Sequence, residues 1–359
     1  MAVTAQAQGF YGTVVIGGVR YSVRSNPQFR ANRNIDVTPN IGTGYPYLYA
    51  EGVITPTFTC SIVPRDVVTT TGLSGRGNPF TYRLLQSIFS RVTTVAPAAP
   101  TWESVCLDTI ATPLTSTAAY AATYNDLLTG GTGGLPSAGI VFFDGVTCTF
   151  IGGVKLDTIR ISFAKGQDIG FDCTFVGTWT RQFSPSSGEM AALMATNSDC
   201  NQVMRFNNVG IEDPASGTNP FADKVFGMTL TYSNNHTPNM GLDGTVYPIA
   251  QNAGMPSAGV SLTLQGLDSV PGDINAVLTE KGIAFTVYGS WDNDAVSWLN
   301  KPRATFTIPN LVVYNPYDRS GTLGRVLRNY SYTALGSCNT PNATAGSPIG
   351  ITLANGWEA

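Results

Sequence analysis

The feature that most limits what this chain can fold into is a strict alternation of apolar and polar residues across residues 157–175. The first half of this stretch runs Thr158, Ile159, Arg160, Ile161, Ser162, Phe163. A short polar turn, Gly166–Asp168, follows, and Ile169–Phe175 then repeats the alternation. A period of two places successive side chains on opposite faces of a β-strand. The stretch therefore predicts a β-hairpin with one buried and one solvated face.

Further strands are expected on both sides of this hairpin. Residues 12–24 predict a short hairpin that turns at Gly17–Gly18. Single strands are expected at residues 52–63, 224–233, 259–266, 303–309 and 324–336. Apolar residues at helical spacing predict a helix over Tyr82–Val92, and weaker helical signals cover residues 116–128, 190–194 and 273–280. The chain is therefore expected to be mainly β.

The second half of the chain repeats the order of the first. Tyr21–Ser22, a polar span and Gly52–Val53 are matched by Tyr232–Ser233, a polar span and Gly259–Val260. We also expect 303–309 to be the counterpart of 157–163, and 324–336 that of 166–177. This order predicts two tandem β-sandwich domains, each with a flanking short helix. The expected boundaries are 1–185 (with an insertion at 93–138), a linker at 186–220, a second domain at 221–338 and an extension at 339–359.

Charge and composition narrow the classes of function. Only 12% of the residues are charged, the net charge is −3, and 43% are hydrophobic. This content is ample for a core, and the basic surface of a nucleic-acid-binding protein is not expected. Residues 1–6 lack the pattern of a signal peptide, and no stretch has the length and apolarity of a membrane span, so synthesis in a cytoplasm is expected. The low charge suggests that much of the surface contacts neighbouring subunits.

Motifs that would carry chemistry are weak or incomplete. His236 is the one histidine, and we expect it to be structural. Leu73–Gly77 matches neither a nucleophile elbow nor a phosphate loop, Trp291–Asp294 lacks most calcium-loop positions, and Glu212–Pro214 predicts a turn. Without a CxxC pair, the cysteines do not suggest a metal site, and Cys60, Cys148 and Cys173 are expected as buried thiols in strands. We therefore expect no enzyme, and no catalytic, cofactor-binding or metal-binding residue.

Two stretches resemble the tail tube (major tail) proteins of long-tailed bacteriophages. They are TIRISFAKGQDIGFDCTFVGTW (158–179) and ATFTIPNLVVYNPYDRSGTLGRVLRNYSYTAL (304–335), and the resemblance extends over residues 14–336. It implies a structural protein of the virion tail, made and assembled in the host bacterial cytoplasm, whose rings stack into a hollow tube for genomic DNA. Members with one domain form rings of six, whereas double-domain members form homotrimers with pseudo-sixfold symmetry. The implied partners are further copies of the chain and the tail-tip and terminator proteins.

The same resemblance gives expectations for individual segments. The Asn- and Pro-rich spans 25–49 and 234–258 are expected to be arms that pack on an adjacent ring. The inner hairpins of the two domains are expected to lie side by side. A lumen that lets DNA slide should be neutral or acidic. The solvated hairpin faces leave the lumen side open, because they carry charges of both signs: Asp157, Arg160, Asp172, Arg325 and Arg328.

Two other classes remain open from the sequence. A capsid decoration or other virion structural protein would share the β-rich, charge-poor composition without needing two domains. A carbohydrate-binding β-sandwich would use tryptophan side chains as stacking platforms, and the candidates are Trp102, Trp179, Trp291, Trp298 and Trp357.

Overall fold

The computed structural model describes the following residues of the chain: 13–16, 19–21, 23–24, 27–39, 46–63, 91–95, 102–108, 138–144, 147–164, 169–183, 209–212, 225–241, 246–252, 254, 257–265, 285–290, 303–308, 311–322, 325–334 and 350–356. Nearly all of them belong to strands, and none belongs to a helix. Within this set, no helix could cross a membrane. The expectation of a mainly β fold is confirmed.

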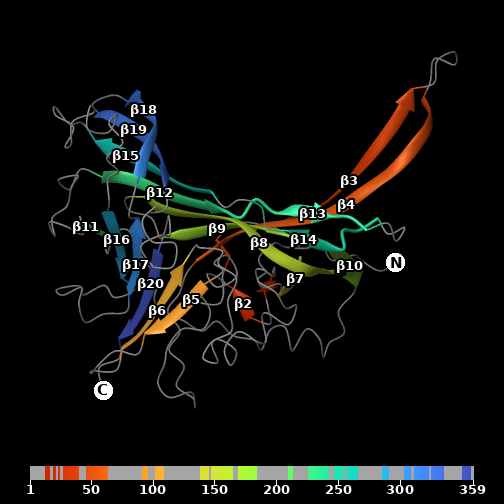
Figure 1. The fold of residues 1–359 in the computed structure, drawn as a ribbon, viewed down its shortest axis with the longest axis horizontal. Helices are drawn as coiled ribbons and strands as arrows, with labels where there is room; N and C mark the ends of the chain where they lie inside the picture. Colours follow the sequence, from red (N-terminus) through yellow and green to blue (C-terminus); the bar gives the residue numbers. More distant parts are fainter. Residues whose placement is uncertain are drawn as a thin grey trace, which may run out of the picture.

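The strands form three antiparallel sheets (Figure 1). The largest has twelve strands: β1 (Thr13–Ile16), β2 (Val19–Tyr21), β3 (Gln28–Pro39), β4 (Pro46–Ile62), β7 (Ala138–Phe143), β8 (Cys148–Ala164), β9 (Gly170–Val176), β10 (Trp179–Phe183), β12 (Val225–Ser233), β15 (Ser257–Gln265), β18 (Leu311–Thr322) and β19 (Arg325–Ala334). The six-stranded sheet contains β5 (Arg91–Val95), β6 (Trp102–Asp108), β11 (Val209–Glu212), β16 (Phe285–Ser290), β17 (Arg303–Ile308) and β20 (Gly350–Gly356). The third pairs β13 (Thr237–Asn239) with β14 (Ala250–Asn252).

Strand β8 connects the parts of the largest sheet. Its first half pairs with β7 on one side and β10 on the other. Its second half pairs with β9 and β12. The pairing of β8 with β9 confirms the hairpin expected at 157–175, and the pairing of β1 with β2 confirms the one expected at 12–24.

The two halves of β8 meet at Gly152–Gly153, where the backbone needs glycine. Gly153 has φ +59°, and a Cβ atom added there would overlap the side chain of Thr178. The backbone N and the Oγ1 of Thr178 both donate hydrogen bonds to the Gly152 carbonyl, each at 3.0 Å. Because glycine tolerates a positive φ and close approach, the sheet can turn here without steric conflict.

The turn allows one part of the sheet to pack on another. The Phe58 ring on β4 lies 5.7 Å, centroid to centroid, from Phe142 on β7. It lies 6.3 Å from Phe175 on the neighbouring strand β9. These contacts enclose a core whose largest fully buried side chains are Phe58, Phe163, Phe171, Phe175 and Ile62. The apolar half of the alternating pattern therefore forms the core, as expected for a sheet with one buried face.

Eight strands of the largest sheet follow the order β3-β4-β9-β8-β12-β15-β19-β18. If the first four strands are numbered by their order in the sequence, they lie side by side in the sheet in the order one, two, four, three. The last four have the same order. The sheet thus contains two groups with equivalent pairings, and the groups are joined directly by the pairing of β8 with β12.

The registers of the two groups also agree. One row of paired residues across the first group is Phe29, Phe58, Phe175 and Leu156. The equivalent row across the second is Leu230, Val260, Tyr332 and Val313. Immediately after each row the register shifts by one residue, between Leu156 and Thr158 in β8 and between Val313 and Asn315 in β18. The agreement therefore extends to the irregularity beside each row, whereas a further shift in β18, between Asn315 and Asp318, has no counterpart in β8.

The remaining strands continue the correspondence. On the first half of the chain, β1 pairs with β7, β7 with β8 and β8 with β10. On the second half, β11 pairs with β16, β16 with β17 and β17 with β20. Strand β6 then pairs with β20, and β5 with β6, so the 93–138 insertion adds strands beside β20. The expected linker contributes β11 to this sheet and the expected C-terminal extension contributes β20.

One expected counterpart was wrong. We expected 303–309 to match 157–163, but β17 lies in the six-stranded sheet, and it is β18 that pairs with β19. Strands β17 and β18 together occupy the place that the two halves of β8 occupy in the first group. Of the expected helix over Tyr82–Val92, only Arg91 and Val92 are described, and they begin β5. The helices expected at 116–128, 190–194 and 273–280 lie outside the described residues.

Candidate assembly interface

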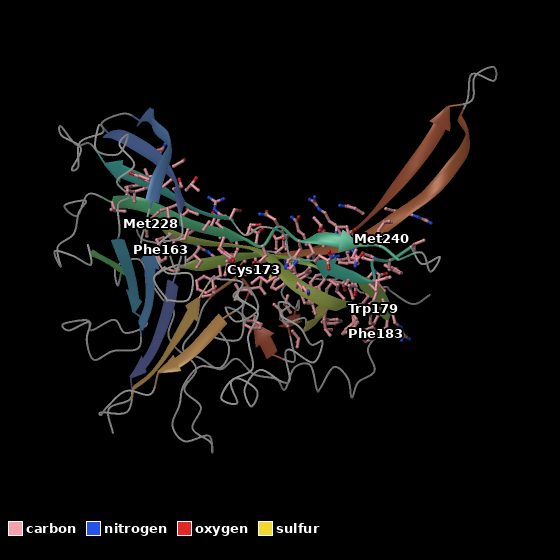
Figure 2. All side chains as sticks on the ribbon, viewed as in Figure 1. Phe163, Cys173, Trp179, Phe183, Met228 and Met240 are labelled. Atoms are coloured by element: carbon pink, nitrogen blue, oxygen red, sulfur yellow. The ribbon has the colours of Figure 1, made fainter. Side chains whose placement is uncertain are left out.

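The joint between the two groups is a continuous antiparallel pairing of β8 with β12. It runs from Ala164 opposite Gly227 to Thr158 opposite Ser233. Along both strands, alternate side chains are buried: Ile159, Ile161, Phe163, Met228, Leu230 and Tyr232. Figure 2 places Phe163 and Met228 close together in the body of the sheet. Apolar burial of this kind stabilises by roughly 25 cal/mol per Å², so the joint is stabilised by side chains as well as by backbone hydrogen bonds.

On the opposite face the joint is polar. The hydroxyl oxygens of Thr158 and Ser233 lie 3.0 Å apart and share a hydrogen bond. Arg160 stands opposite Thr231 across the joint and opposite Asp172 on the other side, in β9. Arg160 and Asp172 are both exposed. Cross-strand hydroxyl pairs and opposite charges stabilise a sheet by about 0.2–1 kcal/mol each.

Beyond β12, the chain forms an arm that docks on the first group. We call residues 234–256, which include β13 and β14, the second arm. At its neck, the buried Asn234 donates its backbone N–H to the Asp157 carbonyl at 2.7 Å and its Nδ2 to the Leu156 carbonyl at 3.1 Å. The His236 N–H donates to Asp157 Oδ1 at 2.7 Å. These bonds fix the arm to β8 where its register with β9 shifts, just beyond the turn at Gly152–Gly153.

The returning strand of the second arm makes matching contacts. Gln251 is 1% exposed, and its Nε2 donates to the Gly177 carbonyl at 2.8 Å. Lys155 Nζ donates to the Gln251 carbonyl at 2.9 Å, and burial lowers the pKa of this ammonium group. Further along, Ile54 N–H donates to the Val246 carbonyl at 2.7 Å. Because buried polar groups are costly unless hydrogen-bonded, these residues specify one docked position.

His236 lies inside this neck, where its backbone N–H is bonded to Asp157. Both ring nitrogens are shielded from solvent and lack a well-aligned hydrogen bond, although the Leu156 and Asn252 backbones lie near enough to favour the protonated ring. Burial is the dominant influence and lowers the pKa of His236, while the Asp157 carboxylate opposes that shift. A neutral imidazole therefore suits the docked arm.

The first arm is a second long hairpin of the same kind. We call residues 33–54 the first arm; it is formed by the outer parts of β3 and β4. Figure 1 shows it extending well beyond the rest of the sheet, at the opposite end of the view from β18. Its register shifts by one residue between Arg33 and Ile35, at its neck. The second hairpin shifts likewise between the Ser233 and Thr237 pairings.

Exposed apolar side chains gather at the end of the molecule from which the first arm projects. The exposed large hydrophobic residues among those described are Trp179, Met240 and Ile249. Figure 2 shows Met240, Trp179 and Phe183 at this end. Trp179 packs against Phe150 with ring centroids 5.0 Å apart and covers Gly152. It is the one tryptophan of the five whose side chain is described.

The cysteines expected to be buried are confirmed as buried free thiols. Cys60 and Cys173 are opposite each other on β4 and β9. Burial, with a smaller contribution from Asp172, raises the pKa of Cys60 to about 12, and burial likewise raises that of Cys173. Both thiols are therefore protonated at neutral pH, which makes them unreactive.

Most of the other motifs singled out in the sequence lie outside the described residues. Glu212 ends β11, whereas Asp213–Pro214, Leu73–Gly77 and Trp291–Asp294 lie outside the described residues. No group of three or more His, Cys, Asp or Glu side chains capable of holding a metal ion occurs in the described part of the chain. Asn234 and Gln251, which anchor the arm, were missed because polar residues in a Pro- and Gly-rich span indicate only a turn or loop.

In comparisons with known proteins, no family model and no curated protein sequence matches this chain.

Proposed function

We propose that this chain is the subunit of a phage tail tube, built from two copies of one β-sandwich domain, and that three chains close each ring. The observation that carries the proposal is the β8–β12 joint, where two groups with the same strand order share one sheet. The joint is head-to-tail: the third strand of one group pairs with the first strand of the next. A heterologous contact of this type generates a ring when its rotation closes.

Strand number supports a wide ring. Each chain contributes eight strands in the order β3-β4-β9-β8-β12-β15-β19-β18. Three chains contribute three times that number, well above the roughly 16–18 strands at which closed barrels enclose a water-filled channel. A ring of three chains, each with two such groups, would have the pseudo-sixfold arrangement of the double-domain tail tube proteins that the sequence resembles.

The polar face of the sheet suits a conduit for DNA. The opposite face forms the core, so only the polar face is left for a lumen. Its side chains are mostly hydroxyls, among them Thr59, Ser61, Thr158, Ser162, Thr174, Thr229, Thr231, Ser233, Ser261, Ser331 and Thr333. Arg160 stands opposite Asp172, so its charge is balanced locally. Arg24, beside Gly170 and Ser61, and Arg30 also lie on this face. Because most of its other side chains are uncharged, the face would release few counterions from DNA and bind it weakly.

The proposal also accounts for the lack of catalytic machinery that the sequence leads us to expect. We propose a virion location in the tail, assembly in the host cytoplasm, and contacts with tail-tip and terminator proteins at the tube ends. Neither a cofactor nor sequence-specific DNA binding is required. The rings stack through the end of the molecule that carries Trp179 and Met240, whereas the second arm, which we expected to pack on an adjacent ring, is docked on its own chain.

Electron microscopy of the purified chain tests the proposal. The full-length protein is concentrated and viewed in negative stain, alone and after addition of a lysate from phage-infected cells as a source of initiator proteins. Hollow tubes of uniform width, or annular rings, are expected. Monomers that persist at millimolar concentration in both conditions would contradict the proposal. Specific glycan binding by such monomers would instead favour a carbohydrate-binding module.

A further inference from the structure

Each end of the eight-stranded order carries an unpaired strand edge. Within the described residues, β3 pairs with β4 alone and β18 pairs with β19 alone. Both edges are long, since each strand contains 12 residues. Long unpaired edges expose backbone N–H and C=O groups to any complementary strand, so proteins normally cover them. These two edges therefore require a partner.

The joint inside the chain shows which partner fits. Strand β18 holds the same place in the second group as β8 holds in the first, and β3 holds the same place as β12. Inside the chain, β8 pairs with β12. If two chains meet through the same kind of joint, β18 of one chain takes the part of β8, and β3 of the other takes the part of β12. The two strands then pair with each other.

The matching rows convert this equivalence into a register. Phe29 and Leu230 occupy equivalent row positions, so Arg30 is the equivalent of Thr231 and Asn32 of Ser233. Thr158 and Asn315 both follow the one-residue shift beside Leu156 and Val313. Asp318 pairs with Asn329 in β19, three positions before Tyr332. Likewise, Arg160 pairs with Asp172 in β9, three positions before Phe175. Asp318 is therefore the equivalent of Arg160.

We propose that β18 of one chain pairs antiparallel with β3 of a second copy, with Asn315 opposite Asn32 and Asp318 opposite Arg30. The extra residue that β18 holds between Asn315 and Asp318, which already shifts its register with β19, bulges from this pairing as well. This inference rests on the proposed function, because it names the contact that closes the ring. Inside the chain, the equivalent positions carry Thr158 opposite Ser233 and Arg160 opposite Thr231.

The residue types at these positions are complementary. Two amides replace the hydroxyl pair that bonds at 3.0 Å inside the chain, and each amide can donate and accept. Opposite charges meet at the Arg30–Asp318 position, which favours this register over those displaced by one residue. Arg30 is exposed, and its guanidinium donates only a 3.3 Å bond to Gln28 on the same strand, so it can reach a partner. Backbone bonding supplies affinity, and the charge pair supplies register.

The first arm then has a docking place. In the chain, the second arm follows β12 and docks beside β8, through Asn234 on Leu156 and Asp157. The first arm follows Asn32 as the second arm follows Ser233, so pairing of β3 with a neighbour's β18 carries the first arm onto the second group of that neighbour. This explains why the first arm extends away from its own chain in Figure 1.

Cysteine cross-linking of the full chain tests the register. Paired residues in an antiparallel ladder have Cα atoms about 4.5–5.5 Å apart, within the range that a disulfide spans. The variant Asn32→Cys with Asn315→Cys should form covalent oligomers on mild oxidation, ending in a closed trimer. The control is Asn32→Cys with Ser331→Cys, because Ser331 is opposite Asn315 but one strand further from the joint. It should cross-link at least tenfold less, as should each variant with only one of the two introduced cysteines beside the six native ones.

Charge reversal provides an independent readout. Arg30→Asp and Asp318→Arg should each raise the concentration needed for assembly by roughly two- to fivefold per joint, and the double reversal should restore it. Assembly into rings without Asn32–Asn315 cross-links and without this rescue would overturn the edge pairing and leave the proposed function standing. Failure of the unmodified chain to associate under any condition would overturn both.

Discussion

Asn234 and Leu156 are 78 positions apart in the chain, yet a hydrogen bond of 3.1 Å from Asn234 Nδ2 to the Leu156 carbonyl joins them. The bond ties the second arm to the kinked strand β8, and Asn234 is only 3% exposed. It shows that the two halves of the chain are held together by side-chain contacts as well as by the shared sheet.

Replacing Asn234 with alanine should destabilise the chain. The change leaves the buried Leu156 carbonyl without this partner, and such losses cost about 1–3 kcal/mol. The free energy of unfolding, measured in urea, should fall by that amount. Asn239→Ala is the matched control, since Asn239 is exposed on β13 and should change stability by less than about 0.5 kcal/mol. Equal effects of the two variants would show that the neck bond is unimportant.

Gly153→Ala should disturb the kink of β8. Alanine is strained at a φ of +59°, and its Cβ would overlap Thr178; strain of this kind costs about 1–3 kcal/mol. Gly227→Ala is the control, because a Cβ there meets only the Phe163 carbonyl oxygen at 3.5 Å. We expect a clear loss of thermal stability for the first variant and little change for the second. An unchanged stability of Gly153→Ala would show that the turn in β8 does not need glycine at this position.

Acidification should loosen the second arm through His236. Its pKa is lowered in the folded chain, so the unfolded chain binds the proton more readily. Stability is then fully present above the ordinary histidine pKa of about 6.5 and falls as pH drops below it. Urea unfolding at pH 7.5 and pH 5.5 should show this loss, and His236→Asn should reduce the difference between the two. An unchanged difference in the variant would assign the pH dependence to other groups.

Cations placed on the hydroxyl face should make the assembled protein hold DNA. Thr231→Lys and Ser261→Lys add positive charge between existing hydroxyls, on the face assigned to the lumen. Assemblies of this double variant should retain short duplex DNA in a salt-dependent manner, since each phosphate contact releases counterions. Gln182→Lys, on exposed edge strand β10, is the control. Equal retention by both would argue that the hydroxyl face does not line the lumen.

The sequence predicted the strands wherever one face is buried. Ile159, Ile161 and Phe163 alternate with polar residues, and the sheet buries them as expected. It was also sufficient to predict that the buried cysteines lie in strands. Alternation is absent where both faces of a hairpin carry polar residues, which is why the span 25–49 indicated an arm without revealing β3 or the beginning of β4; the rest of β4 was predicted as the strand at 52–63.

Strand β18 shows a second limit. Its sequence, LVVYNPYDRSGT, contains Asn-Pro and Ser-Gly, which normally mark turns. The register shifts between Asn315 and Asp318, so Pro316 lies at an irregularity of the ladder, where proline is tolerated. Residues 303–309 have the cleaner alternation and were therefore matched to the wrong partner. The docking of Asn234 and Gln251 depends on long-range pairing, which local patterns do not contain.

The number of chains in one ring tests the central claim most directly. Rings formed by the full-length protein can be weighed by mass photometry or native mass spectrometry. If each chain supplies two equivalent groups to one continuous sheet, the rings contain three chains. Rings of six chains would contradict the two-group account, because each chain would then occupy one position of the sixfold ring.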